Sequence, residues 1–227
     1  RYDLDAALDA VGRLSPAGLA SDAGSLAALL LMPVLGFTLG VVVATHDRRN
    51  GALALRWARS TPLRIVSAKT AAVVILVSGT SALIHVVAGM GGMALLAARD
   101  SVTGSLPIDV VATQPAIGNA LVIALDVLAG SSFGVLGLAF GSLLRGRTAI
   151  LSTFAVSYFL LPLGGTADPR NALALLGRDF LTFPGPFTAA PVTDMSPPFG
   201  LAILATMALA SVGVVAIAWH TRLPARR

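Results

Sequence analysis

An aspartate in the middle of an apolar stretch is the residue of this sequence best suited to chemistry. Asp126 lies in the segment VIALDVLAG, with hydrophobic residues on both sides. An ionised carboxylate inside a hydrocarbon layer costs several kcal/mol, so such a residue usually faces protein or water and marks a functional site. Asp126 is therefore a candidate for lining a transport path. The alternative is a packing role, in which its carboxyl group hydrogen-bonds to a neighbouring Ser or Thr.

Few other side chains could support catalysis or metal binding. The chain has no Cys and no Glu, and only three His. Disulfides, thiolate metal sites and cysteine nucleophiles are thereby excluded, and little remains for a metal centre or an acid–base pair. His85, in SALIHVVAG, has no metal-ligand partner at helical spacing, which favours a core histidine bonded to a carbonyl or hydroxyl group. We predict no catalytic residue, no metal site and no cofactor bound by this chain.

Four glycines follow Asp126 at spacings of four, three and four residues. They are Gly130, Gly134, Gly137 and Gly141. A face of small residues lets two helices in a membrane approach closely. The pattern predicts helix packing rather than contact with a substrate.

The composition indicates a membrane protein. Apolar residues make up 56% of the chain and charged residues 12%, and the mean hydropathy is +0.83. These values depart from soluble averages in the direction expected when lipid is the main solvent. The alternative, a soluble all-helical core, would need polar stripes with a period of 3.6 residues, whereas the long segments are apolar all round.

Five segments are long and apolar enough to cross a hydrocarbon core of about 30 Å, which takes about 20 helical residues. We therefore expect an all-α, polytopic membrane protein with five transmembrane helices. The third and fourth form a hairpin whose basic tip is Arg145-Gly146-Arg147. The predicted spans are Leu26 to Ala44, Thr70 to Ala97, Ala116 to Leu144, Thr148 to Leu163 and Phe199 to Trp219.

The charges divide between the two ends of these spans. One side receives residues 46–69, the hairpin tip and the C-terminal tail, with eleven basic residues and one acid, Asp47. The other side receives five Arg and nine Asp. The positive-inside rule places the first side in the cytoplasm. We therefore expect a multi-pass plasma-membrane protein with a cytoplasmic C-terminus and an external residue 1, preceded by one further outward-running helix or by a cleaved signal peptide.

The chain is predicted to form a single transmembrane domain, residues 1–227, with three notable regions outside the predicted spans. Residues 1–25 are expected to form helices on the external surface. Residues 46–69 form the sizeable cytoplasmic loop. Residues 164–200 form an external loop in which the stretch NALALLGRDFLTF could re-enter the outer membrane face.

The cytoplasmic loop HDRRNGALALRWARSTPLRIVSAK favours a short helix after Gly51, stopped before Pro62. Its arginines satisfy the positive-inside rule and can meet anionic headgroups, with Trp57 at the interface. The alternative is a helix that docks a partner protein. The partner-docking candidates are Arg49, Gly51, Leu53, Leu55, Arg56, Trp57, Arg59 and Pro62.

The same loop resembles the first cytoplasmic loop of type-2 ABC exporter permeases. The resemblance rests on an acidic residue, a Gly plus a small residue, a leucine-rich helix, a Pro-containing turn, Arg and then Lys. The chain has Ala54 where the family usually has a second leucine-type residue, and it also departs at Asp47 and Ala52, where Glu and Thr are usual. The hairpin at residues 131–165 is similar to the family's fourth and fifth spans. The matching positions are Asp47, Gly51, Ala52, Leu53, Leu55, Pro62, Arg64 and Lys69.

The resemblance implies a permease with six spans, paired with a second copy or a homologous permease. Two cytoplasmic ATPase subunits would dock on the loop helix, and ATP and Mg²⁺ would bind to them. This chain has no phosphate loop of its own, because its one Lys, Lys69, follows Ala68 and has Leu63 where the first Gly of the motif belongs. We therefore expect a substrate path without ATP hydrolysis.

Two other functions remain open. An ion-coupled secondary transporter would also be a polytopic bundle, with Asp126 and His85 in a proton relay, but it would leave the loop pattern unexplained and would normally carry internal repeats. A membrane anchor subunit that transports nothing is the other alternative. An enzyme or a nucleic-acid-binding protein is not indicated.

Overall fold

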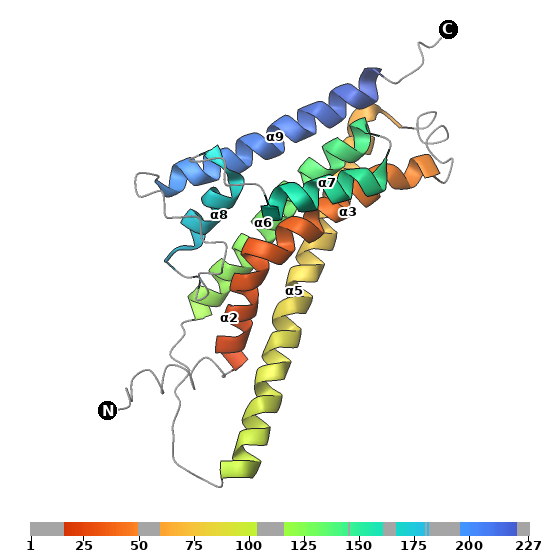
Figure 1. The fold of residues 1–227 in the computed structure, drawn as a ribbon. Coiled ribbons are helices and arrows are strands. Elements are labelled where there is room, and N and C mark those ends of the chain that lie inside the picture. The colour runs from red at the N-terminus through yellow and green to blue at the C-terminus, as the bar shows by residue number, and fades with distance from the viewer. Residues whose placement is uncertain are drawn as a thin grey trace.

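The structure, a computed structural model, describes residues 16–49, 60–103, 116–144, 146–160, 167–179, 181 and 196–221. All regular elements in these ranges are helical (Figure 1). They are α2 (Pro16–Leu26), the π-helix η1 (Ala27–Leu31), α3 (Met32–Arg49), α5 (Pro62–Thr103), α6 (Ala116–Leu143), α7 (Arg147–Leu160), α8 (Pro169–Gly177) and α9 (Pro197–Thr221).

Four helices in the described ranges are long and apolar enough to cross a membrane. They span Pro16–His46, Leu63–Leu95, Asn119–Leu143 and Pro197–Trp219. The all-helical membrane character is therefore confirmed, but the predicted count of five is not. The difference is α7, which has 14 residues and a length of about 21 Å at 1.5 Å per residue. That is shorter than a hydrocarbon core of about 30 Å.

The first membrane helix begins earlier than predicted. Residues 16–25 were expected to form part of a surface helix, but α2, η1 and α3 follow one another without a break from Pro16 to Arg49. The reason is the small side chains of α2, which bury Gly18, Ser21, Gly24 and Ser25 against the neighbouring helices. The predicted segment at residues 1–15 lies outside the described residues.

A bend separates α2 from α3 at the π-helix (Figure 1). Pro33 has no N–H group, so it cannot donate to the carbonyl oxygen of Leu29, its acceptor in a regular α-helix. The hydroxyl group of Tyr158 on α7 donates to that oxygen at 2.6 Å. Proline and π-bulges are the common causes of sharp helix bends. Here α7 supplies a hydrogen bond to the carbonyl group of Leu29, which Pro33 cannot serve.

The centre of the bundle is the contact between α3 and α6, with α5 and α9 packed on their flanks. An aromatic cluster joins α7 to this centre. The ring of Phe37 stacks on Phe154 with centroids 3.7 Å apart, and Phe133 meets the ring of Tyr158 edge to face at 5.6 Å. These contacts hold α7 along the bundle although it is too short to cross a membrane alone.

The helices alternate in direction, so one end of the bundle collects several helix ends. The C-termini of α3, α6 and α9 and the N-termini of α5 and α7 lie at this end (Figure 1). We call it the basic end, because residues 46–69, the hairpin tip and the C-terminal tail adjoin it. The sequence also predicted that these segments share one side.

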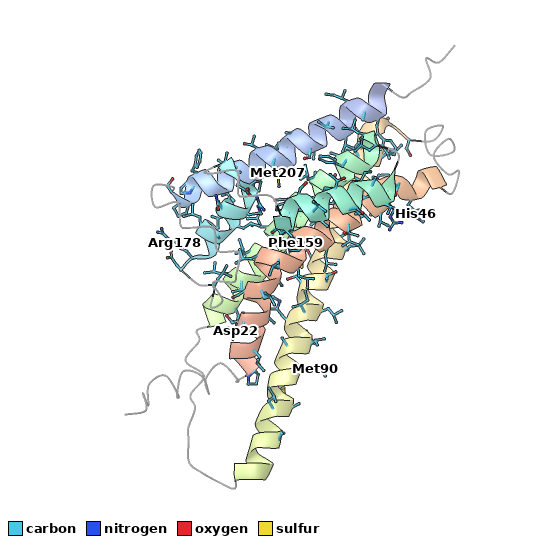
Figure 2. All side chains as sticks on the ribbon, viewed as in Figure 1. Asp22, His46, Met90, Phe159, Arg178 and Met207 are labelled. Carbon is cyan, nitrogen blue, oxygen red and sulfur yellow. The ribbon has the colours of Figure 1, made fainter. Side chains whose placement is uncertain are left out.

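The far half of α5 extends past the other helices (Figure 1). Its large apolar side chains are exposed, and Met90 and Met93 are each 65% exposed (Figure 2). On α9, Leu209 is 72% exposed and Ile217 is 65% exposed. Apolar surface of this extent marks contact with lipid or with another protein rather than with water.

The predicted external loop at residues 164–200 contains α8, which packs against α9, α6 and η1. Asp168 caps its N-terminus by accepting from the backbone N–H of Arg170 at 2.8 Å. The guanidinium group of Arg170 pairs with Asp168 at 2.7 Å and donates to the carbonyl oxygen of Tyr158 at 2.7 Å. Because Ala172 and Leu173 are fully buried, α8 presents its apolar face to protein.

Candidate functional site

Asp126 is fully buried near the middle of α6. The hydroxyl group of Ser81 on α5 donates to its Oδ2 atom at 3.3 Å, and Nδ1 of His85 lies 3.7 Å from the same oxygen. The other carboxylate oxygen, Oδ1, is buried and has no hydrogen-bond partner among the described residues. We call Ser81, His85 and Asp126 the polar triad.

His85 is oriented by its own helix. Its Nδ1 atom lies 2.9 Å from the carbonyl oxygen of Ser81, one turn earlier on α5. A carbonyl oxygen can only accept, so Nδ1 carries a proton and Nε2 has the free lone pair of the neutral ring. That Nε2 atom is buried and has no hydrogen-bond partner among the described residues.

Gly24 on α2 makes room for the imidazole ring. A Cβ atom at this position would lie 2.5 Å from Nε2 of His85 and 2.5 Å from a methyl carbon of Val122. A side chain larger than hydrogen would therefore displace the ring from its place between α2 and α6. The sequence analysis missed Gly24, and nothing in the linear sequence links it to His85.

The sequence left Asp126 with two interpretations, a path-lining residue or a carboxyl group bonded to Ser or Thr. The structure places it against a serine, and it also places His85 beside it. The sequence favoured a core histidine bonded to a carbonyl or hydroxyl group and joined His85 to Asp126 only in the ion-coupled alternative. The unpartnered Oδ1 and Nε2 atoms distinguish the triad from an ordinary packing contact, since buried polar atoms are nearly always hydrogen-bonded. The polar triad therefore contains two buried atoms, Oδ1 of Asp126 and Nε2 of His85, that can each accept a hydrogen bond and have no donor in the described structure.

The four glycines of α6 lie along α3. A Cβ atom at Gly137 would overlap the backbone carbonyl of Phe37, and one at Gly141 would come within 2.7 Å of the Cβ atom of Ala44. Gly130 and Gly134 lie close to α5 as well. A Cβ atom at Gly130 would lie 2.6 Å from a methyl carbon of Val77, and one at Gly134 would lie 2.4 Å from a methyl carbon of Val73. The α6 glycines thus lie where three helices meet.

The opposite side of this contact carries two more glycines that the sequence analysis missed. A Cβ atom at Gly36 would overlap the carbonyl group of Gly130, and one at Gly40 would overlap that of Gly134. Their spacing of four residues in GFTLG is a recognised signal for close helix packing. The two glycine faces together form what we call the glycine seam between α3 and α6.

Four helices are tied together at the basic end by Lys69 and Trp219. The ammonium group of Lys69 on α5 donates to the carbonyl oxygen of Val43 on α3 and lies 5.3 Å from the ring centroid of Trp219 on α9. The indole N–H of Trp219 donates to the hydroxyl oxygen of Ser142 on α6 at 3.1 Å. Lys69 is 5% exposed, so we call this group the basic-end junction.

Most of the partner-docking candidates fall in a part of the loop that the structure does not describe. Gly51, Leu53, Leu55, Arg56, Trp57 and Arg59 lie outside the described residues, as does the predicted short helix. Arg49 is the last residue of α3 and Pro62 is the first residue of α5. The two described ends of the loop are therefore both at the basic end.

An apolar cavity of about 420 Å³ lies between α3, α6 and α7. Phe37, Phe140 and Phe154 contribute aromatic walls, and Thr153 and Ser157 are its hydroxyl-bearing residues. Its volume is in the range of small-molecule sites.

No group of three or more His, Asp or Glu side chains within the described ranges could hold a metal ion. Comparison of the chain with protein-family models, with curated proteins and with solved structures gave no match.

Proposed function

We propose that this chain is the membrane-spanning permease subunit of an ATP-driven ABC exporter. It forms the substrate path, pairs with a second copy or a homologous permease, and docks separate ATPase subunits on residues 46–69. ATP and Mg²⁺ bind to those subunits. The chain lies in the plasma membrane with its basic end and C-terminus in the cytoplasm.

The observation that carries this proposal is the position of Lys69. It is the last residue of the loop pattern that resembles the exporter permeases, and it is buried in the basic-end junction rather than exposed to headgroups. Lys69 lies on α5, the helix that follows the loop. Its contact with Val43 joins α5 to α3, the helix that precedes the loop, and its contact with Trp219 joins α5 to α9. A force applied to the loop by a docked ATPase would therefore reach three membrane helices at once.

The docking itself depends on apolar side chains. Leu53, Leu55 and Trp57 would enter a groove on the ATPase and supply most of the binding energy, because buried aromatic and aliphatic anchors dominate protein interfaces. Arg56 and Arg59 would steer and orient an acidic partner surface. If the loop only met headgroups, the arginines would matter more than the apolar residues.

The test is affinity purification of the full chain from its native membranes, followed by measurement of ATP hydrolysis. We expect an ATP-hydrolysing subunit to copurify with the wild type and to be lost when Leu53→Ala is combined with Trp57→Ala. Replacing Arg56 and Arg59 with Gln should weaken copurification less, and this effect should shrink at high salt, where the attraction of the arginines to an acidic surface is already screened.

A matched control removes one Leu and one aromatic ring at the other end of the bundle. Phe199→Ala with Leu201→Ala alters two half-exposed residues of α9 and should leave copurification unchanged. If no ATP-hydrolysing subunit accompanies the wild type, or if the Leu53 and Trp57 double variant retains it in full, the loop is a topological anchor and the proposal fails.

The polar triad favours a second candidate, an ion-coupled secondary transporter. A buried carboxyl group beside an imidazole is the arrangement expected of a proton relay in a membrane bundle. The two candidates differ in their energy source. Transport that continues in vesicles without ATP and stops when the ion gradient collapses would favour the second.

A further inference from the structure

We infer that Asp126 and His85 together bind one proton inside the bundle and exchange it with water at the end of α6 where Asn119 lies. This goes beyond the proposed exporter function, which gives the triad no role, and it specifies the binding site and the side of access that the second candidate leaves open. It does not depend on an ATPase partner.

The surroundings of the polar triad favour a net charge of zero. Val122, Ala129 and Val77 are fully buried around it, and an uncompensated charge in such surroundings costs several kcal/mol. A carboxylate and a neutral imidazole carry one negative charge in total. One added proton gives either a carboxylic acid beside a neutral imidazole or a carboxylate beside an imidazolium, and both are neutral.

The unpartnered atoms are those to which such a proton would bind. Oδ1 of Asp126 and Nε2 of His85 are both buried without a hydrogen-bond partner in the described structure. A hydronium ion gives its proton to one of them and leaves a water molecule. Because Oδ2 of Asp126 lies 3.7 Å from Nδ1 of His85, a proton bound to either group changes the charge that the other group faces at close range.

A proton fits this site better than a metal cation. The oxygen ligands available are the carboxylate of Asp126 and the hydroxyl group of Ser81, since the carbonyl oxygen of Ser81 is already occupied by Nδ1 of His85. Magnesium and calcium need about six or more oxygen ligands. Gly24 and Val122, which border His85, provide no ligand side chain.

Polar groups lead away from the triad in one direction. Asn119 lies seven residues before Asp126 on the same face of α6, about 10 Å away along the helix, and its buried side-chain oxygen has no partner in the described ranges. On α2, Asp22 (Figure 2) borders a cavity of about 530 Å³ together with Ala88 and Gly91 of α5. Ala88 is three residues from His85 on the same helical face.

In the opposite direction the residues on the Asp126 face of α6 are apolar, and the buried hydroxyl group of Thr70 on α5 lies about 16 Å from Ser81 along the helix. Ala129, Gly130, Phe133 and Gly134 follow Asp126 on α6, and they pack against α3 and α5 in the glycine seam. A proton would therefore enter from the end opposite to the basic end.

The remaining titratable groups that face the triad can be named for each helix of the described structure. Asp22 is the group on α2, and Lys69 on α5 is about 24 Å from His85 along the helix axis. His46 on α3 and Arg147 on α7 lie at the basic end, and the hydroxyl group of Tyr158 on α7 donates to the carbonyl oxygen of Leu29. On α8, Asp168 and Arg170 are paired with each other. Asp126 is the titratable group of α6 within its described range, and the described parts of η1 and α9 contribute none to the triad. Asp126 and His85 are thus each other's nearest titratable neighbour among the groups named here.

Infrared spectroscopy of the purified full chain in lipid nanodiscs tests this inference. We expect either a carboxylic-acid C=O band or imidazolium ring bands that change between about pH 5 and pH 9, shift in deuterium oxide and are lost in Asp126→Asn. His85→Gln should change the proton affinity of the remaining site by at least about tenfold, a shift of one pH unit. Asp179→Asn, which alters a side chain 79% exposed, is the matched control and should keep the band unchanged.

The inference is overturned if the wild type shows neither the carboxylic-acid band nor the imidazolium bands with a pH dependence in this range, or if the same change persists in Asp126→Asn. It is also overturned if His85→Gln leaves the titration unchanged, because the two groups then do not act as a pair. Helical circular dichroism and size-exclusion chromatography report whether each variant folds. Should Asp126→Asn not fold, the wild-type titration and the His85→Gln shift decide the question. Since no ATPase is present, a negative result here leaves the proposed exporter function untouched.

Discussion

The hydroxyl group of Tyr158 hydrogen-bonds at 2.6 Å to the carbonyl oxygen of Leu29, 129 residues earlier in the chain. Proline at position 33 removes the N–H group that would serve this oxygen in an α-helix. Water is scarce inside a membrane, so a backbone carbonyl without a partner is costly there. The short helix α7 therefore stabilises the bend of the first membrane helix, although its described part, Arg147–Leu160, is shorter than a hydrocarbon core.

We expect Tyr158→Phe to lower the free energy of unfolding by about 1–2 kcal/mol, because the ring contacts remain and only the hydrogen bond is lost. Thermal unfolding in detergent measures the change. Thr80→Val is the control, since it removes a hydroxyl group that bonds within its own helix at an exposed position, and its effect should stay within about 0.5 kcal/mol. Equal stability of Tyr158→Phe and the wild type would show that another group satisfies Leu29.

The glycine seam predicts that Gly→Ala substitutions will destabilise the protein in the seam but not at open positions on α5. Gly36→Ala and Gly137→Ala should each destabilise the protein by about 1–3 kcal/mol, because the added methyl group would overlap backbone of the facing helix. Gly79 and Gly89 on α5 face open space. Replacing either with Ala should be neutral or stabilise the helix by up to about 1 kcal/mol. Unfolding measurements that rank the two groups alike would contradict the close approach of α3 and α6.

The basic-end junction predicts energetic coupling between Lys69 and Trp219. In a double-mutant cycle with Lys69→Met and Trp219→Leu, the interaction energy should be about 1 kcal/mol, the size expected for a desolvated cation over an indole ring. The control cycle pairs Lys69→Met with Tyr158→Phe, two distant changes that should add within about 0.5 kcal/mol. Additivity in both cycles would mean that the cation and the ring do not stabilise each other.

The absence of cysteine makes the orientation directly testable. Ser60 and Ser196 are both exposed and precede α5 and α9 respectively. In intact cells, a membrane-impermeant maleimide should label Ser196→Cys, whereas Ser60→Cys should react only after the membrane is opened. This follows if the basic end is cytoplasmic. The unsubstituted chain, which should not react, is the control, and labelling of both positions from one side would contradict the predicted alternation of the helices.

The sequence by itself determined the helical class and the positions of most membrane segments. Apolar stretches of at least 20 residues can satisfy their backbone hydrogen bonds in lipid only as helices or closed barrels, so α5, α6 and α9 lie close to their predicted ranges. The α6 glycines were also visible, because spacing along one helix is a local property. The predicted start of the first membrane helix at Leu26 was wrong, because small residues such as those of α2 can pack inside a bundle as well as lie on its surface.

Only the tertiary structure decided which side chains meet. Asp126 and His85 lie 41 positions apart, and their proximity depends on how α5 and α6 cross and on the space that Gly24 leaves on α2. Gly36 and Gly40 gain their meaning from the α6 backbone that faces them. Hydropathy registers how apolar a residue's neighbours along the chain are, whereas a buried polar contact depends on distances between helices that are far apart in sequence. For that reason the membrane character followed from the sequence, and the polar triad, the glycine seam and the basic-end junction followed from packing.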